Sequence, residues 1–150
     1  MRFNKNLATK AFRLAKLMMA SFIFFTVFAV ILLRFFNPPF TSFMVWESSF
    51  FRKNIEYDWT SLPNMGENIT FSVVATEDSN FCNHIGVDIK EIYKVIKKNE
   101  KRGASTITQQ LAKNLFLWSG RSWSRKIIEL YFTVLIEIII PKRRILELYL

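Results

Sequence analysis

The sequence predicts an all-α protein in which one N-terminal transmembrane helix precedes a helical lobe. Two observations lead to this class. Residues 17–33 are apolar and carry no charge, and apolar side chains after residue 64 recur at helical spacing. Only four Gly and four Pro interrupt the 150 residues, which excludes long disordered or low-complexity segments. A chain of this length suits one domain with its own core.

The composition limits the kinds of partner. Twenty-one Lys and Arg against twelve Asp and Glu give a net charge of +9, which favours an anionic partner: nucleic acid, lipid headgroups or a phosphorylated substrate. The only cysteine, Cys82, cannot form an internal disulfide. A single histidine excludes a His-rich metal cluster.

The N-terminal segment is expected to be a basic cytoplasmic tail, residues 1–16, followed by a membrane anchor, residues 17–36. The tail has no acidic residue and contains Arg2, Lys5, Lys10, Arg13 and Lys16. A helix over residues 17–33 is about 25 Å long, and Arg34 can snorkel while Phe35 and Phe36 extend the span. The positive-inside rule then puts the N-terminus in the cytoplasm and the remainder on the outer face.

A cleaved signal peptide is the competing interpretation of the same segment. It requires small residues after the apolar run, whereas the sequence there is LLRFFNPPF. We therefore favour an anchor. Residues 1–34 contain six basic and no acidic side chains, so the remainder has fifteen basic against twelve acidic residues. Ten of those basic residues lie between Lys90 and Lys126, where an anionic ligand is expected, although Lys90 to Arg102 equally fits a solvated helix face.

Residues 37–63 are expected to be a juxtamembrane connector, because Asn37-Pro38-Pro39 ends the span and residues 40–63 show no clean period. Its aromatic residues fit either the membrane interface or the surface of the lobe. A short helix is predicted from Asn64 to about Thr76, which leaves Glu77 and Asp78 at a helix end. Adjacent acids at such a place are usually a solvated helix terminus.

Two amphipathic helices are predicted next. The first has isoleucines at 85, 89, 92 and 96 and is expected to stop at Gly103. The second is expected to be capped by Ser105 and to carry Ile107, Leu111 and Leu115 on one face.

The segment from Ile127 to Ile140 is apolar on all sides except at Glu129, Thr133 and Glu137, so it predicts a helix that is buried or pressed against lipid. Arg125 lies one turn before Glu129, and a simple ion pair would explain the carboxylate. The functional alternative keeps Glu129 at the wall of a site. Pro141 fits the start of a further helix.

Four blocks give the chain a family resemblance: ATEDSNFCNHIGVD at 75–88, GASTITQQLAKNLFL at 103–117, RSWSRKIIE at 121–129 and KRRILELYL at 142–150. In order and spacing they resemble the peptidoglycan glycosyltransferases of bacterial cell walls, specifically the monofunctional group with a single anchor. The resemblance covers residues 37–150. It implies a lysozyme-like helical glycosyltransferase lobe, whose N-terminal part would occupy residues 64–150.

The resemblance also implies the reaction. Members of this family polymerise lipid II into β-1,4 glycan strands at the outer face of the bacterial cytoplasmic (inner) membrane and release polyprenyl diphosphate. Glu77 would be the general base that takes a proton from the acceptor 4-hydroxyl, with burial or the charge of Asp78 tuning it. Lys113 and Arg121 would be the cations that receive the leaving diphosphate.

The remaining site residues follow from the same blocks. Ser105, Thr106, Gln109 and Gln110 would line the cleft as polar contacts. Arg125 and Lys126 accompany Glu129, the second essential carboxylate, which would position the diphosphate, the nearby basic residues or a divalent cation. Such a cation, for example Mg²⁺, is the one candidate cofactor, and no metal ligand is assigned. His84 and Asp88 are expected to be loop scaffolding.

Partners and alternatives complete the expectation. The expected partners are lipid II, the nascent strand, the membrane and, as a further candidate class, other cell-wall synthesis proteins. Nucleic acid is not expected on the outer face. Family members continue beyond Leu150, so the lobe is expected to be incomplete. Two alternatives stay open: an inactive anchored remnant that binds lipid-linked precursors or synthases, and a lysozyme-like hydrolase with paired carboxylates.

Overall fold

The computed structural model describes residues 5–51, 54–100, 102–120 and 122–150, and every regular element in that part of the chain is a helix. The all-α prediction is therefore confirmed. The elements are α1 (Lys5–Phe35), α2 (Ser42–Phe51), η1 (Leu62–Asn64), α3 (Glu67–Glu77), η2 (Phe81–Asn83), α4 (Ile89–Lys97), α5 (Ile107–Phe116), α6 (Trp123–Ile139) and α7 (Lys142–Tyr149).

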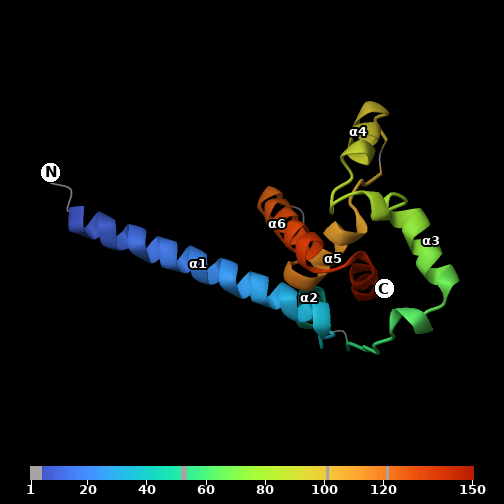
Figure 1. Ribbon diagram of the computed structural model, residues 1–150, viewed down its shortest axis with the longest axis horizontal. Helices are drawn as coiled ribbons and strands as arrows, with labels where there is room; N and C mark the ends of the chain where they lie inside the picture. The colour runs from blue at the N-terminus through green and yellow to red at the C-terminus, as the bar shows by residue number, and fades with distance from the viewer. Residues whose placement is uncertain (1–4, 52–53, 101, 121) are drawn as a thin grey trace.

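Helix α1 extends from the lobe as a long rod (Figure 1). Residues Ala8–Phe35 of this helix are long and apolar enough to cross a membrane. The predicted membrane-type helix is thus present, and it begins inside the segment that the sequence predicts to be a basic tail.

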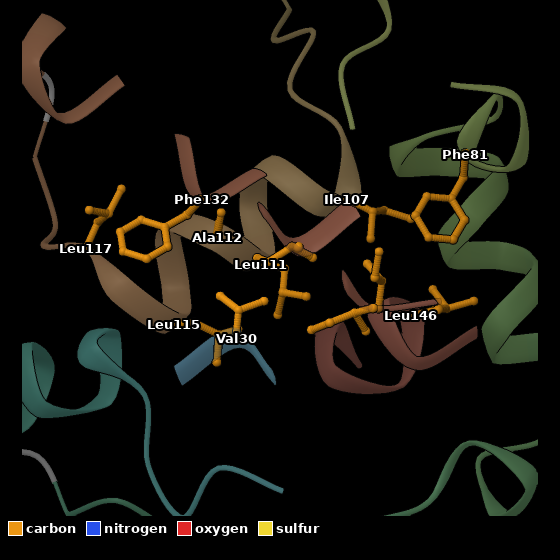
Figure 2. Packing of buried hydrophobic residues seen from close by; sticks show 12 residues of the cluster. Val30, Phe81, Ile107, Leu111, Ala112, Leu115, Leu117, Phe132 and Leu146 are labelled. Atoms are coloured by element: carbon orange, nitrogen blue, oxygen red, sulfur yellow. The ribbon is translucent and has the colours of Figure 1, made fainter. Parts of the chain in front are cut away.

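Helix α5 is the centre of the core. It contacts α2, α6 and α7, and its side chains Ile107, Leu111, Ala112 and Leu115 are buried. The four-residue spacing of the first, second and last of these puts them on one face, as predicted. Figure 2 shows them among Phe132 of α6, Leu146 of α7 and Val30 of α1. Phe116 and Phe132 stack with their ring centroids 4.1 Å apart.

Helix α6 has two different faces. Glu129, Phe132, Thr133 and Ile136 are buried against the lobe. The opposite face exposes an apolar stripe whose members follow one another at three- or four-residue spacing: Trp123, Ile127, Leu130, Val134 and Ile138. The sequence predicts burial or lipid contact for this helix, and the structure buries one side only.

Helix α1 is held against the lobe by side-chain contacts. The hydroxyl oxygens of Thr26 and Tyr131 are 2.6 Å apart, and Arg34 donates a hydrogen bond of 2.7 Å to the carbonyl of Ile139. Arg144 of α7 donates to the carbonyl of Leu33, 3.0 Å away. Val30 is fully buried in the same core as α5 and α6.

The predicted connector contains a helix that the sequence pattern does not reveal. Helix α2 packs on α5, and its first residue, Ser42, donates hydrogen bonds to the carbonyls of Leu117 at 2.8 Å and Asn114 at 3.2 Å. The sequence pattern does not predict this helix because its apolar and polar residues do not separate into two faces.

The predicted boundaries of α4 and α5 are wrong in two places. Helix α4 ends at Lys97, not at Gly103, because Asn99 adopts a left-handed conformation with φ 51° and Glu100 donates back to the carbonyl of Val95. Ile85 precedes this helix. The cap of α5 is Thr106, not Ser105.

Helix α4 projects away from the rest of the lobe (Figure 1). Its apolar residues Ile89, Tyr93 and Ile96 are exposed, as are its lysines. Several of the charges pair locally, as Lys94 does with Glu91 at 3.2 Å. Lys101 lies outside the described residues.

Candidate active site

Glu77 lies at the C-terminal end of α3 on the surface of the lobe. Its carboxylate is exposed and accepts a hydrogen bond of 2.9 Å from the side-chain nitrogen of Gln110 on α5. The burial expected to tune this group is therefore not present. Glu77 borders a polar cavity of about 260 Å³, which Ser105 and Thr106 also line. Because the carboxylate is exposed, a hydroxyl group from solution can approach it.

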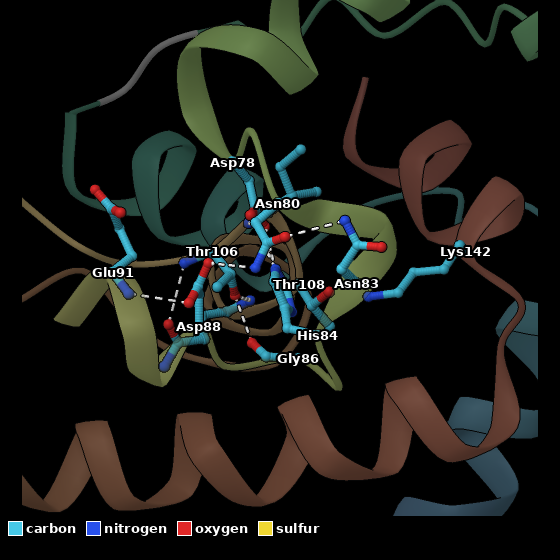
Figure 3. Close-up of polar contacts among 12 residues, drawn as sticks. Asp78, Asn80, Asn83, His84, Gly86, Asp88, Glu91, Thr106, Thr108 and Lys142 are labelled. Atoms are coloured by element: carbon cyan, nitrogen blue, oxygen red, sulfur yellow. Dashed lines mark hydrogen bonds and ion pairs between the residues drawn. The ribbon is translucent and has the colours of Figure 1, made fainter. Parts of the chain in front are cut away.

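Asp78, next in the chain, points into the protein. Its carboxylate accepts hydrogen bonds from Nε2 of His84, 2.9 Å away, and from the backbone N–H of Ile107, 3.0 Å away. It thereby joins the end of α3 to the start of α5 (Figure 3). The expectation that Asp78 acts on Glu77 is replaced by a structural role, because both carboxylate oxygens already bind partners inside the lobe.

Residues 80–88 form a hydrogen-bonded loop around this pair. Asp88 caps α4 by accepting from the backbone N–H of Glu91 at 3.0 Å, and Asn80 donates to its other oxygen at 2.9 Å. The bond from the Glu91 backbone holds the pKa of Asp88 below its ordinary value. Thr106 donates to the carbonyl of Gly86 at 2.5 Å. His84 and Asp88 thus have the scaffolding contacts that the sequence predicts.

Glu129 is the buried carboxylate of the site, with a side chain only 3% exposed. Arg125 donates to it at 2.7 Å, and Lys126 forms a second ion pair with it. Lys126 also donates to the hydroxyl of Ser105, 3.2 Å away. The ion pair considered in the sequence is therefore real. The bond to Ser105 additionally places this cluster beside the cavity that Glu77 borders.

The two glutamines of α5 have different surroundings. Gln109 is buried, and its side-chain oxygen accepts from the backbone N–H of Thr106 at 3.1 Å, closing a capping box. Its side chain caps the N-terminus of α5 and does not line the cavity. Gln110 instead contacts Glu77 and Tyr149.

The two cations expected at the diphosphate are only partly described. Lys113 is half-buried, and its nitrogen lies 5.9 Å from the ring centroid of Phe43 on α2. It is one turn after Gln110 on α5, so both side chains share one side of that helix. Arg121 lies outside the described residues.

Sequence reasoning missed two contacts that hold the site together. Glu137 accepts from Thr108 of α5 at 2.5 Å and from Lys142 of α7 at 2.8 Å. Tyr149 of α7 donates to the side-chain oxygen of Gln110 at 3.0 Å. Glu137 could have been found, since a carboxylate in an apolar helix requires a partner. Tyr149 carries no comparable signal.

A divalent cation does not fit the carboxylates near the cavity. Across the described ranges, no three His, Cys, Asp or Glu residues are grouped so as to hold a metal ion. Glu129 is already paired with two cations, and Asp88 and Glu91 bind the helix start and Arg102.

The fold and the site define a class: helical proteins with one N-terminal membrane-type helix, an exposed glutamate that borders a polar cavity, and a buried glutamate beside it that is paired with two cations. Comparison with known proteins identifies the family. The chain belongs to the transglycosylase family, whose family model matches residues 47–150. That match begins inside the predicted connector and includes only the second half of α2, residues 47–51.

Individual relatives agree. The chain is 46% identical over 139 residues to a biosynthetic peptidoglycan transglycosylase of Haemophilus influenzae, which covers 85% of this chain and 58% of that protein. It is 43% identical over 148 residues to the protein of that name from Stutzerimonas stutzeri, and the alignment covers 92% of this chain and 60% of that protein. It is also 43% identical over 145 residues to the protein of that name from Shewanella oneidensis, and the alignment covers 91% of this chain and 61% of that protein. The chain thus spans about three fifths of the length of these curated relatives.

Proposed function

We propose that this protein is a peptidoglycan glycosyltransferase that polymerises lipid II into β-1,4 glycan strands. The observation that carries the proposal is the arrangement of the two glutamates. Glu77 borders the polar cavity, and the Lys126–Glu129–Arg125 cluster reaches the same cavity through Ser105. The names of the relatives support the same reaction class.

In the proposed reaction Glu77 takes the proton of the acceptor 4-hydroxyl. The acceptor oxygen then bonds to the anomeric carbon of the growing strand as the bond from that carbon to the diphosphate oxygen breaks. The configuration inverts, and polyprenyl diphosphate leaves. An exposed carboxylate with one hydrogen bond can meet an incoming hydroxyl group directly, which is the first requirement of a general base.

Cations are needed where negative charge develops on the leaving group. We propose that Lys113 and Arg121 receive the diphosphate, as the resemblance implies. Glu129 would have an indirect role: it fixes Arg125 and Lys126 in one orientation, so that Lys126 stays at the edge of the cavity. Ser105, Thr106 and Gln110 would supply the polar contacts to the sugars.

Helices α1 and α6 support a proposal for how each segment of the chain lies relative to the membrane. We propose that residues 1–16 lie in the cytoplasm, residues 17–36 cross the inner membrane, residues 37–63 connect and residues 64–150 lie on the periplasmic face. Contacts between α6 and α1 reach from Arg34 to Phe22, whose ring centroid lies 5.9 Å from that of Tyr131. Twelve residues of helix correspond to about 18 Å. The exposed stripe on α6 would therefore face lipid, so that α6 enters the bilayer beside α1 while the rest of residues 64–150 stays on the periplasmic side, close to the lipid tails of both substrates.

The test is lipid II polymerisation by the Glu77→Gln variant in detergent or liposomes, with glycan products separated by length. We expect a loss of about 100-fold or more, because general-base catalysis typically contributes 10²–10⁴-fold. Glu67→Gln is the matched control, since it removes an exposed carboxylate from the other end of α3. Helical circular dichroism would show that both variants keep the fold.

Other outcomes select other functions. Polymerisation retained by Glu77→Gln would remove Glu77 as the base. Binding of lipid II by the unaltered chain without any product would favour the anchored binding protein. Release of soluble sugar fragments from purified cell wall would favour a hydrolase.

A further inference from the structure

We propose that Tyr149 is a positioning residue for Glu77 and acts through the side-chain amide of Gln110. The proposal rests on the role proposed for Glu77 and adds a residue from α7, which has no other assigned part in the reaction. The three side chains come from three helices: Glu77 from α3, Gln110 from α5 and Tyr149 from α7.

The geometry forms a continuous chain of two hydrogen bonds. The Tyr149 hydroxyl donates to the Gln110 side-chain oxygen at 3.0 Å, and the Gln110 side-chain nitrogen donates to the Glu77 carboxylate at 2.9 Å. A primary amide accepts only through its oxygen and donates only through its nitrogen. A donor on one side of Gln110 and a carboxylate on the other therefore fix which way the amide faces.

Tyr149 can hold this orientation because its hydroxyl remains a donor. Burial raises the pKa of Tyr149 above its ordinary value of 10.0, and the negative charge of Glu77 raises it further. The phenol is accordingly protonated at neutral pH. Without that hydroxyl, the amide could turn its oxygen toward Glu77 and repel the carboxylate.

The helix that carries Tyr149 is itself fixed. Ile145 and Leu146 of α7 are buried in the core beside α5, and Lys142 at its start pairs with Glu137 of α6. The hydroxyl therefore reaches Gln110 from a rigid element. This arrangement explains why an exposed carboxylate at the end of α3 has a defined direction.

The other charged groups around Glu77 have separate partners. Asp78, on the same helix end, binds His84 and the backbone of Ile107. Asp88, Glu91 and Arg102 line the same cavity from the α4 side. Asp88 caps α4, and Arg102 pairs with Glu91 and Glu100. Among the described residues, the hydrogen bond that Glu77 receives comes from Gln110.

The first experiment does not need activity. In full-length protein in detergent micelles, with 15N-labelled glutamine side chains, the Gln110 amide signal is assigned by its loss in Gln110→Ala. We expect this signal to shift in Tyr149→Phe and in Glu77→Gln, since each removes one of its two partners. It should not shift in Tyr131→Phe, whose hydroxyl contacts Thr26 instead. A signal that Tyr149→Phe leaves unchanged would overturn the proposal.

The second experiment measures polymerisation. Removal of one neutral hydrogen bond should lower kcat of Tyr149→Phe about three- to tenfold with KM for lipid II nearly unchanged. In a Gln110→Ala background, Tyr149→Phe should have no further effect, because Tyr149 acts through that amide. Tyr131→Phe is again the control and should keep kcat.

Additive effects of Tyr149→Phe and Gln110→Ala would overturn the proposal, since a merely structural tyrosine would behave in that way. The two hypotheses fail separately. Absence of polymerisation by the unaltered protein would contradict the proposed function, while the amide signal would still decide whether Tyr149 orients Gln110.

Discussion

Gly86 occupies a backbone position that leaves no room for a side chain. Its φ is +78°, and a Cβ atom there would lie 2.7 Å from a methyl carbon of Thr133 and 2.8 Å from Cγ of Glu137. The loop after α3 therefore passes directly over α6 at this point, and the Gly86 carbonyl also accepts a hydrogen bond from Thr106 at the start of α5. Gly66 has a similar φ of +80° but has nothing within 4 Å of the same position.

These two glycines provide a matched pair. Gly66→Ala should cost about 1–2 kcal/mol of folding free energy, because only the left-handed backbone is penalised. Gly86→Ala should cost about 1–3 kcal/mol more, because Thr133 and Glu137 must also move. Thermal unfolding in detergent, followed by helical circular dichroism, would measure both. Equal losses in the two variants would contradict the close packing at Gly86.

For single residues, the sequence indicates which side chains are important better than it indicates which residues they contact. Glu129 and Arg125 could be paired from their spacing on one helix, and the structure confirms that pair. The inward direction of Asp78 could not be predicted, because it depends on His84 and the backbone of Ile107, which the fold brings together. Tyr149 was missed for the same reason, since its partner lies 39 residues earlier.

Among the helices, α4 depends most on local signals, because it projects from the lobe and its apolar residues are exposed. Asp88 begins it by accepting from the backbone N–H of Glu91, and a left-handed Asn99 follows its end. Such a helix has little packing to support it, so its capping residues should determine how often it unfolds locally.

The contribution of Asp88 should depend on pH. Its pKa is lowered in the folded protein, so its charged form stabilises α4 above about pH 3.8, and this stabilisation is lost as pH falls through the lower folded value. Asp88→Asn keeps a capping oxygen but removes the charge. We expect hydrogen exchange of the Glu91 amide to show up to about 1 kcal/mol less protection in this variant at pH 6.

The difference should be smaller at pH 2 than at pH 6, because the Asp88 carboxylate becomes protonated as pH falls through its lowered folded pKa. Asp58→Asn, in the exposed connector, is the control and should leave the Glu91 amide unchanged. A loss of protection in Asp88→Asn that is the same at both pH values would show that the charge of Asp88 is not what stabilises the cap.

Helices with one apolar face could be predicted from the sequence, and those held by isolated contacts could not. Helix α5 was found through the spacing of Ile107, Leu111 and Leu115, all of them buried. Helix α2 was missed because its apolar and polar residues do not separate into two faces. The end of α4 was misplaced because Asn99, rather than Gly103, takes the left-handed conformation.

The whole molecule can be tested for orientation with its own cysteine. Cys82 is exposed on the lobe, which we propose to face the periplasm. In cells with a permeabilised outer membrane, a membrane-impermeant maleimide should label Cys82. In a Cys82→Ala, Ala8→Cys variant the new thiol should react only after lysis. Labelling of Ala8→Cys but not of Cys82 in intact cells would reverse the proposed topology.

The whole chain was predicted as an anchor followed by a helical lobe, and the structure has an apolar N-terminal helix of sufficient length followed by a helical lobe. The sequence could not predict how the two fit together. The bonds between Thr26 and Tyr131 and between Arg34 and Ile139 join residues that are 105 positions apart in both cases. No periodicity within either helix identifies such partners.

Those bonds have a mechanical consequence. The lobe cannot swivel about the end of α1 without breaking them, so its tilt relative to the bilayer plane should be nearly constant. In the proposed reaction the product is pushed out repeatedly, one disaccharide at a time. If the lobe cannot rotate about α1, the growing glycan strand would leave it in the same direction after every addition.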